Sequence, residues 1–125
     1  FLSHDGADLA AAWSTIARVG DADGLWECVD HAFPGSTIEI HEVGGRLELA
    51  MKQPGMLRPL ASRELSEGTM RYLMLAVALH APRPPALMAL NEPEANLHED
   101  LLGSLARLIQ QASRSMQLIV ITHAT

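Results

Sequence analysis

The sequence predicts an α/β fold whose mainly parallel core is preceded by helices and a small antiparallel β subdomain. Uninterrupted apolar runs at residues 86–90 and 118–121 flank a helical pattern. Such runs are typical of strands that are buried between helices in a parallel sheet. Residues 38–51 instead alternate between apolar and polar side chains around a Gly-Gly pair, which indicates an antiparallel hairpin.

Two amphipathic helices are expected at the start of the chain. Asp5 or Asp8 can cap the first helix, which ends at Gly20. The second helix begins at about Asp23 and is stopped by Pro34-Gly35. The apolar side chains on these helices recur at helical spacing, and we expect them in the core together with both tryptophans: Leu9, Trp13, Ile16, Leu25, Trp26, Val29 and Phe33.

A hairpin and a candidate third strand form the predicted β subdomain. The pair Gly44-Gly45 lies between the two alternating segments and suits a two-residue hairpin turn. A second turn at Pro54 precedes residues 56–60, which are a candidate for a further strand.

The parallel core is assigned to residues 63–125, and the helical segment with the antiparallel β subdomain to residues 1–62. Ser66 is well suited to cap a helix that ends before Pro82, because serine favours the N-cap position and proline cannot continue a helix. A strand, an amphipathic helix over residues 101–109 and a second strand follow.

Two carboxylates lie just beyond the first predicted core strand. Glu92 and Glu94 follow Asn91, and Pro93 stops the backbone from continuing the strand ladder. A strand, helix, strand unit of this length is expected to place its two strands parallel, and such crossovers are right-handed in about 98% of cases. Glu92 and His123 therefore come out on the same edge of the sheet, at the carboxyl ends of its strands, where open α/β sheets bind ligands.

Charge and composition exclude several classes of function for this segment. Nine basic and fifteen acidic residues give a formal net charge of −6, and the bases form no cluster. Nucleic acid is therefore not indicated as a partner, because its binding needs a basic stripe. No apolar run approaches the roughly 20 residues that span a bilayer, so no membrane partner is expected. The single cysteine, Cys28, falls in a helical pattern and is interpreted as a buried free thiol in a reducing cytoplasm.

Four short motifs follow one another in the second half of the chain. In this order they resemble the carboxyl-terminal part of an ABC-type ATPase. The sequence Glu-Pro-Glu followed by Leu-His is similar to the corresponding motif of the RecF/SMC-like predicted ATPases, an AAA_21-like family. The matching residues are Leu65, Ser66, Glu67, Gly68 and Thr69 for the ABC signature, Leu87 to Leu90 with Asn91 and Glu92 for the Walker B strand, Asn96, Leu97 and His98 for the D-loop, and His123 for the switch histidine.

The resemblance implies a P-loop NTPase-like half-domain that binds ATP and Mg²⁺ and works as an ATP-sandwiched homodimer through its signature and D-loop. Glu92 would then polarise the attacking water, because a carboxylate there can accept the proton or hold the water's orientation. His123 would hydrogen-bond the γ-phosphate. The start of the signature helix would attract phosphate held by a second subunit, and the residues there are Ser66, Glu67, Gly68 and Thr69.

Two departures from the family pattern bear on activity. No Gly-x-x-x-x-Gly-Lys-Ser/Thr phosphate loop occurs in the 125 residues. We therefore expect a carboxyl-terminal fragment that is inactive as an ATPase by itself and depends on a Walker A lysine in a missing amino-terminal half. Asn91 stands where the pattern often has the aspartate that helps to hold Mg²⁺. An amide can bind a metal-bound water but brings no charge, which weakens the metal site.

Alternative interpretations stay open at this point. Glu-Pro-Glu also suits an ordinary solvated turn, and Ser-Glu-Gly-Thr suits a simple capped helix start. A metal-dependent hydrolase could use Glu92, Glu94, His98 and His123, because carboxylate and imidazole bind several divalent ions. A non-catalytic dimerisation module could use nucleotide only as a clamp.

Overall fold

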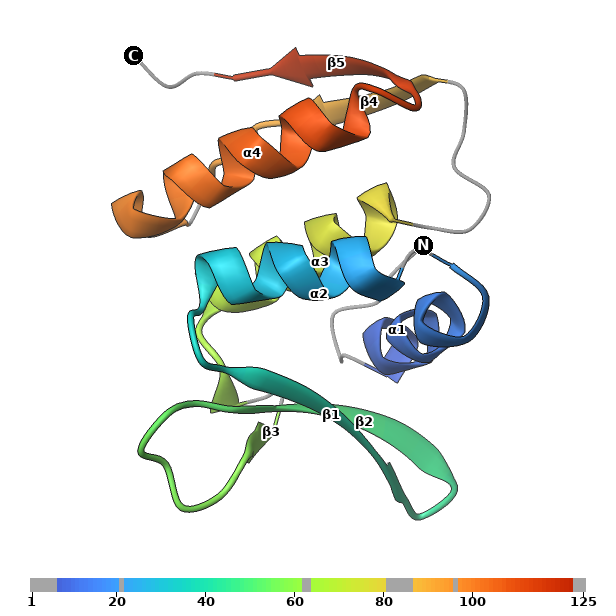
Figure 1. The fold of residues 1–125 in the computed structure, drawn as a ribbon, viewed down its shortest axis with the longest axis vertical. Coiled ribbons are helices and arrows are strands. Elements are labelled where there is room, and N and C mark those ends of the chain that lie inside the picture. Colours follow the sequence, from blue (N-terminus) through green and yellow to red (C-terminus); the bar gives the residue numbers. More distant parts are fainter. Residues whose placement is uncertain (1–6, 21, 62–63, 81–86, 96, 123–125) are drawn as a thin grey trace.

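The computed structural model describes residues 7–20, 22–61, 64–80, 87–95 and 97–122. Figure 1 shows an antiparallel sheet at the bottom, a layer of helices in the middle and a pair of parallel strands at the top. The predicted α/β fold, with the antiparallel sheet before the parallel pair, is confirmed. Within the described ranges, none of the helices has the length and apolar character needed to cross a membrane.

The two predicted opening helices are confirmed as α1 (Ala7–Val19) and α2 (Ala22–Ala32). Trp13 of α1 is buried, as expected. The expectation for Trp26 is wrong, because 43% of its surface is exposed. α2 turns Leu25 into the core, and the next residue lies about 100° round the helix, since a helix has 3.6 residues per turn. This offset turns the Trp26 side chain towards solvent.

The antiparallel sheet has the order β1-β2-β3, with β1 at Thr37–Val43 and β2 at Arg46–Lys52. Its predicted hairpin is confirmed. Gly44 and Gly45 form the turn with φ angles of 59° and 81°, the left-handed values that a type I′ hairpin turn requires and that glycine adopts without strain.

The candidate strand at residues 56–60 is wrong in its extent, because β3 covers only Leu60–Ala61. A turn precedes this strand. In that turn the Met56 N–H donates to the Gln53 carbonyl at 3.1 Å. Pro59 has no N–H to donate to a strand ladder. Pairing with β2 therefore begins only after it.

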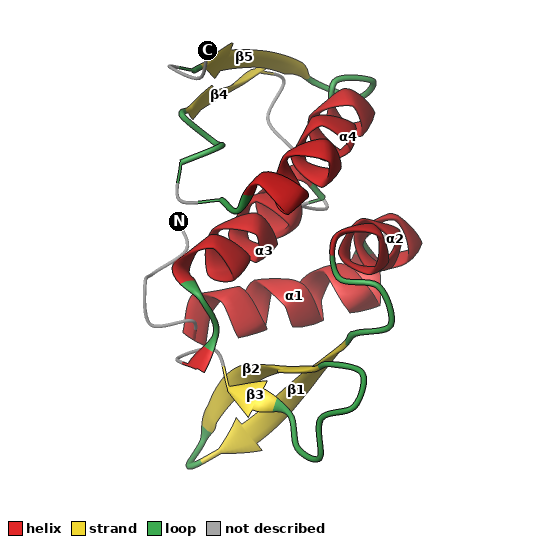
Figure 2. Cartoon of the chain, turned by 90° about the vertical axis from the view of Figure 1, so that its left-hand side faces the viewer, coloured by secondary structure: helices red, strands yellow, loops and turns green. Residues whose placement is uncertain are grey.

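α3 (Glu67–Leu79) is the central helix and packs against α1, α2 and α4. Figure 2 shows α1, α3 and α4 stacked between the two sheets. A single hydrophobic core cluster takes side chains from α1, α2, β2, α3, β4 and α4. The two halves of the chain thus share one core, and a boundary at residues 62 and 63 stays a prediction.

The parallel pair consists of β4 (Leu87–Asn91) and β5 (Gln117–Ile121), which confirms both predicted core strands and their direction. The short 3₁₀ helix η2 (Glu99–Leu101) and α4 (Leu102–Ala112) connect them. α4 lies against one face of the pair (Figure 1).

The prediction that the first core strand is buried on both faces is wrong for the described residues. In β4 only Leu90 is buried. Leu87, Ile119 and Ile121 are 52%, 50% and 49% exposed. A parallel strand is buried on both faces only when helices cover both, and among the described elements α4 covers one.

Candidate functional site

The signature-like segment forms the start of α3. Ser66 has the extended backbone of an N-cap, with φ −65° and ψ 157°. Its Oγ accepts a hydrogen bond from the Thr69 N–H at 3.1 Å and donates one to the Thr69 Oγ1 at 2.8 Å. The predicted N-cap is confirmed. Ser66 and Glu67 are exposed and Gly68 is buried, so the positive end of the α3 dipole faces outward at Ser66.

Glu92 leaves β4 through an unusual backbone conformation. Its φ of 49° is the only positive value at a non-glycine residue among the described residues. Residues other than glycine and asparagine rarely adopt this backbone conformation, because it costs about 1 to 3 kcal/mol. The Glu92 N–H donates to the Ile121 carbonyl at 2.6 Å, and the Glu92 carbonyl accepts from the Ala95 N–H at 3.0 Å. The chain therefore turns sharply at the carboxyl edge of the parallel pair, and the Glu92 side chain is half-buried there.

Arg71 joins α3 to this turn, and the sequence motifs gave no sign of it. Its guanidinium Nη2 donates to the Glu92 carbonyl at 2.8 Å and to the Asn91 carbonyl at 3.5 Å. Its Nε donates to the Pro93 carbonyl at 3.4 Å. One side chain thus contacts three successive carbonyls between β4 and η2. A lone arginine in the second turn of a helix carries no pattern from which this contact could be predicted.

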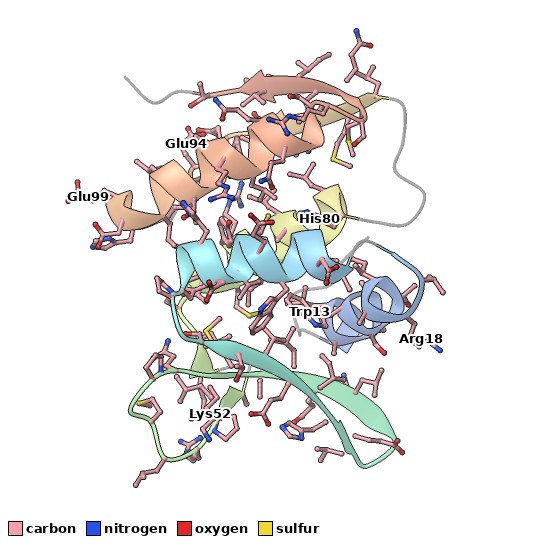
Figure 3. All side chains as sticks on the ribbon, viewed as in Figure 1. Trp13, Arg18, Lys52, His80, Glu94 and Glu99 are labelled. Atoms are coloured by element: carbon pink, nitrogen blue, oxygen red, sulfur yellow. The ribbon has the colours of Figure 1, made fainter. Side chains whose placement is uncertain are left out.

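A second link closes the same edge from β5. The Thr122 Oγ1 donates to the Glu94 Oε2 at 2.6 Å, so the segment after β5 is bound to the segment after β4. Glu94 lies on the parallel-pair side of the molecule, away from His80 and Trp13 (Figure 3). The predicted meeting of the two strand ends is therefore present in the described residues. His123 follows Thr122 directly but lies outside them.

The residues that match the D-loop lead into α4. Leu97 packs against the hydrophobic core. His98 caps η2, since its Nδ1 accepts from the Asp100 N–H at 3.2 Å, and its side chain is exposed. Asn96 lies outside the described residues. In this structure His98 thus has a local structural role as a cap.

The metal-hydrolase alternative has no ligand cluster in the part of the chain that the structure describes. No group of three or more histidine, cysteine, aspartate or glutamate side chains there is arranged to hold a metal ion. Mg²⁺ prefers oxygen ligands and keeps several waters. At the edge of the parallel pair, the side-chain oxygens include the exposed Asn91 amide and the carboxylates of Glu92 and Glu94.

A family model described as "AAA domain, putative AbiEii toxin, Type IV TA system" matches residues 3–125. No curated protein matches the chain. The SMC head domain from Thermotoga maritima is 24% identical, with a TM-score of 0.63 over 94% of this chain and 41% of that one. A structure from work on the ATP-driven dimerization and DNA stimulated activation of SMC ATPases is 20% identical, with a TM-score of 0.68 over 94% and 72%.

A third similar structure is the Smc head domain with a coiled coil and joint from Pyrococcus yayanosii. It is 23% identical with a TM-score of 0.62, and the match covers 81% of this chain and 21% of that one. The chain thus spans about a fifth of the Pyrococcus structure. At these identities the likeness concerns the fold, which is that of part of an SMC ATPase head of the P-loop NTPase type. With the family match over nearly its whole length, the chain belongs to the AAA domain family that the motifs of its second half resemble.

Proposed function

We propose that the chain is the carboxyl-terminal part of an ATP-binding and ATP-hydrolysing ABC-type ATPase of the RecF/SMC-like kind. The observation that carries this proposal is the position of Glu92, at the carboxyl edge of the parallel pair with its backbone held by both β5 and α3. Ligands of open α/β sheets bind at this edge. Family membership supports the choice of ATP as the ligand.

The proposed chemistry assigns one role to each polar group at the edge. Mg²⁺ would neutralise charge on the phosphate oxygens when it is bound. Glu92 orients a water molecule for attack on the γ-phosphate and accepts its proton. Asn91, at the end of β4, would help to hold the Mg²⁺ ion through a hydrogen bond to one of its waters. His123, which directly follows Thr122, contacts the γ-phosphate.

The start of α3 serves a second nucleotide in this proposal. Ser66 is exposed while Glu92 is half-buried, and Ser66 lies about 7.5 Å further along the α3 axis than Arg71, at a rise of 1.5 Å per residue. The helix amino terminus suits a phosphate group presented from outside. Two copies would then hold ATP between them, with the D-loop residues Asn96, Leu97 and His98 at the same interface.

The exposed face of the parallel pair supports the proposal that more of the ATPase head covers it. Leu87, Ile119 and Ile121 form an apolar surface that a parallel sheet normally buries under a second layer. We assign the phosphate-binding loop to that additional layer, because no such loop occurs in the 125 residues. Cys28 is buried and is the single cysteine of the 125 residues, so it forms no disulfide within the chain, which fits the reducing cytoplasm.

Mixing two inactive variants of the full-length protein tests the composite site. One variant is Ser66→Arg and the other has its Walker A lysine replaced. In a mixed dimer one site carries both defects and the other carries neither, so we expect ATPase activity to return in part. Ser113→Arg, at an exposed serine on the end of α4, is the matched control and should be active without mixing.

The opposite result would remove the main mechanistic claim. If mixed dimers form and are no more active than either variant alone, Ser66 does not act on the partner's nucleotide. Activity of Ser66→Arg by itself at the level of Ser113→Arg would show that the start of α3 takes no part in hydrolysis.

A further inference from the structure

The contact of Arg71 with the turn after β4 suggests a role that none of the matched motifs assigns. We propose that Arg71 is a positioning residue that holds the Glu92 carboxylate in place and links it to the nucleotide-facing start of α3. This inference rests on the proposed function. Its basis is the set of three hydrogen bonds from the Arg71 guanidinium to the carbonyls of Asn91, Glu92 and Pro93.

The bond to Glu92 is the strongest of the three. At 2.8 Å from Nη2 to the carbonyl oxygen it is a charge-assisted hydrogen bond of ordinary length, whereas the bonds at 3.4 Å and 3.5 Å are long. The Glu92 carbonyl also accepts from Ala95, and the Glu92 N–H donates to Ile121. Both backbone polar groups of Glu92 are therefore bound, and the bond from Arg71 links the Glu92 backbone to α3.

The backbone of Glu92 needs such support because its φ is positive. The backbone of a non-glycine residue in the left-handed region returns to an ordinary conformation when the surrounding contacts are lost. Rotation of φ by tens of degrees would swing the Cβ and the carboxylate away from the edge of the parallel pair. Arg71 therefore acts on the direction of the Glu92 side chain through the Glu92 backbone.

The same geometry makes the start of α3 and Glu92 parts of one rigid unit. Ser66 and Arg71 lie five residues apart on a single helix, and Ser66 is fixed to that helix by its N-cap bonds to Thr69. A movement of the α3 start that accompanies docking of a second subunit's nucleotide is carried by the helix to Arg71 and to the turn.

Arginine suits this geometry better than lysine does, so lysine should replace it only in part. The planar guanidinium presents several N–H donors and can reach successive carbonyls, whereas an ammonium group acts as a point charge on a flexible stem. Arg107 is a suitable matched control, because it is half-buried like Arg71 but pairs with the Glu27 carboxylate at 2.8 Å on the α2–α4 side of the molecule.

The test is steady-state ATPase kinetics of the full-length protein with Arg71→Met, Arg71→Lys and Arg107→Met. We expect Arg71→Met to lower kcat by about 10- to 100-fold, the effect of misplacing a catalytic group by about 1 Å. KM for ATP and ATP-driven dimerisation should stay near the wild-type values. Arg71→Lys should be intermediate, and Arg107→Met should keep the wild-type kcat.

A double variant separates positioning from general damage to the fold. If Arg71 acts through Glu92, Arg71→Met should cause no further loss of the residual turnover in a Glu92→Gln background, because effects on one catalytic unit are not additive. The inference would be overturned if the kcat losses of the two single variants multiplied in the double variant. It would also be overturned if Arg71→Met changed kcat and KM by the same factor. If Arg71→Met does not fold, Arg71→Lys carries the test, and a wild-type kcat in that variant overturns it.

The same experiment keeps the inference and the proposed function apart. Full activity of Glu92→Gln would contradict the proposed role of Glu92 itself. Loss of activity in Glu92→Gln together with a wild-type kcat in Arg71→Met would leave the proposed function standing and remove only the role of Arg71.

Discussion

The two sheets differ in how well the burial of their side chains agrees with their apolar sequence pattern. The antiparallel hairpin alternates in sequence, and it has one covered face, with Leu49 and Met51 fully buried. The parallel pair has unbroken apolar runs, yet Ile119 and Ile121 on its outer face are half exposed. Helices of this chain cover the apolar face of the antiparallel sheet. The apolar pattern of the parallel pair predicts a second covering layer, which is consistent with its proposed place in a larger ATPase head.

The largest effect is expected in the covered sheet, for Leu49→Ala. Leu49 is 0% exposed and belongs to the core cluster. Removing its side-chain atoms should lower the free energy of unfolding by about 2 to 5 kcal/mol. Urea denaturation of the 125-residue chain measures this loss. A loss below about 1 kcal/mol would mean that β2 is not packed against α1 as the structure has it.

A smaller effect is expected at Tyr72, which joins α3 to α2 in the helical layer between the two sheets. Its hydroxyl donates to the Cys28 carbonyl at 3.1 Å. Tyr72→Phe should therefore cost about 1 kcal/mol of unfolding free energy, the usual value of one hydrogen bond. A melting curve identical to that of the wild type at neutral pH would contradict the bond.

The pH dependence of the free energy of unfolding, compared between the wild type and Tyr72→Phe, tests the burial of Tyr72 in a second way. Burial, with a smaller contribution from Cys28, raises the pKa of Tyr72 above its ordinary value. The unfolded chain ionises its tyrosine near pH 10 while the folded chain keeps it neutral, so stability is present below about pH 10 and is lost as the pH rises further. Tyr72 is the single tyrosine of the chain, so Tyr72→Phe should lack this contribution to the alkaline loss.

The smallest effect is expected on the open face, for Ile119→Ala. In the 125-residue chain this change should alter the free energy of unfolding by no more than about 0.5 kcal/mol, as for other surface positions. In the full-length protein the proposed second layer should raise the loss to about 2 kcal/mol or more. An equally small effect in both proteins would show that the outer face of the parallel pair stays uncovered.

The sequence predicted those features of the fold that depend on local pattern. Helical spacing located α1 and α2, the Ser66 cap and Pro82 located α3, and the glycine pair located the hairpin turn. The expectation for Trp26 failed because it relied on hydrophobicity alone, whereas the helical spacing of Leu25, Val29 and Phe33 marks the face of α2 that meets the core. Pro59 shortened a strand that apolar content favoured.

The candidate site was predicted where motifs mark it and missed where only tertiary contacts do. Ser66 and Glu92 stand out by their neighbours in the sequence. Arg71 and Thr122 do not, because their partners lie about twenty or more residues away and are backbone carbonyls or a carboxylate brought close by the fold. The left-handed backbone of Glu92 likewise follows from those contacts and has no signal in the residue type.

The central claim is that Glu92 activates water for ATP hydrolysis, and one substitution tests it directly. In the full-length protein, Glu92→Gln should keep ATP binding and ATP-driven dimerisation while turnover falls by about 100-fold or more, the usual contribution of a general base. Glu99→Gln, at an exposed glutamate of η2 (Figure 3), should retain the wild-type rate. Turnover of Glu92→Gln within a few-fold of the Glu99→Gln rate would contradict the account.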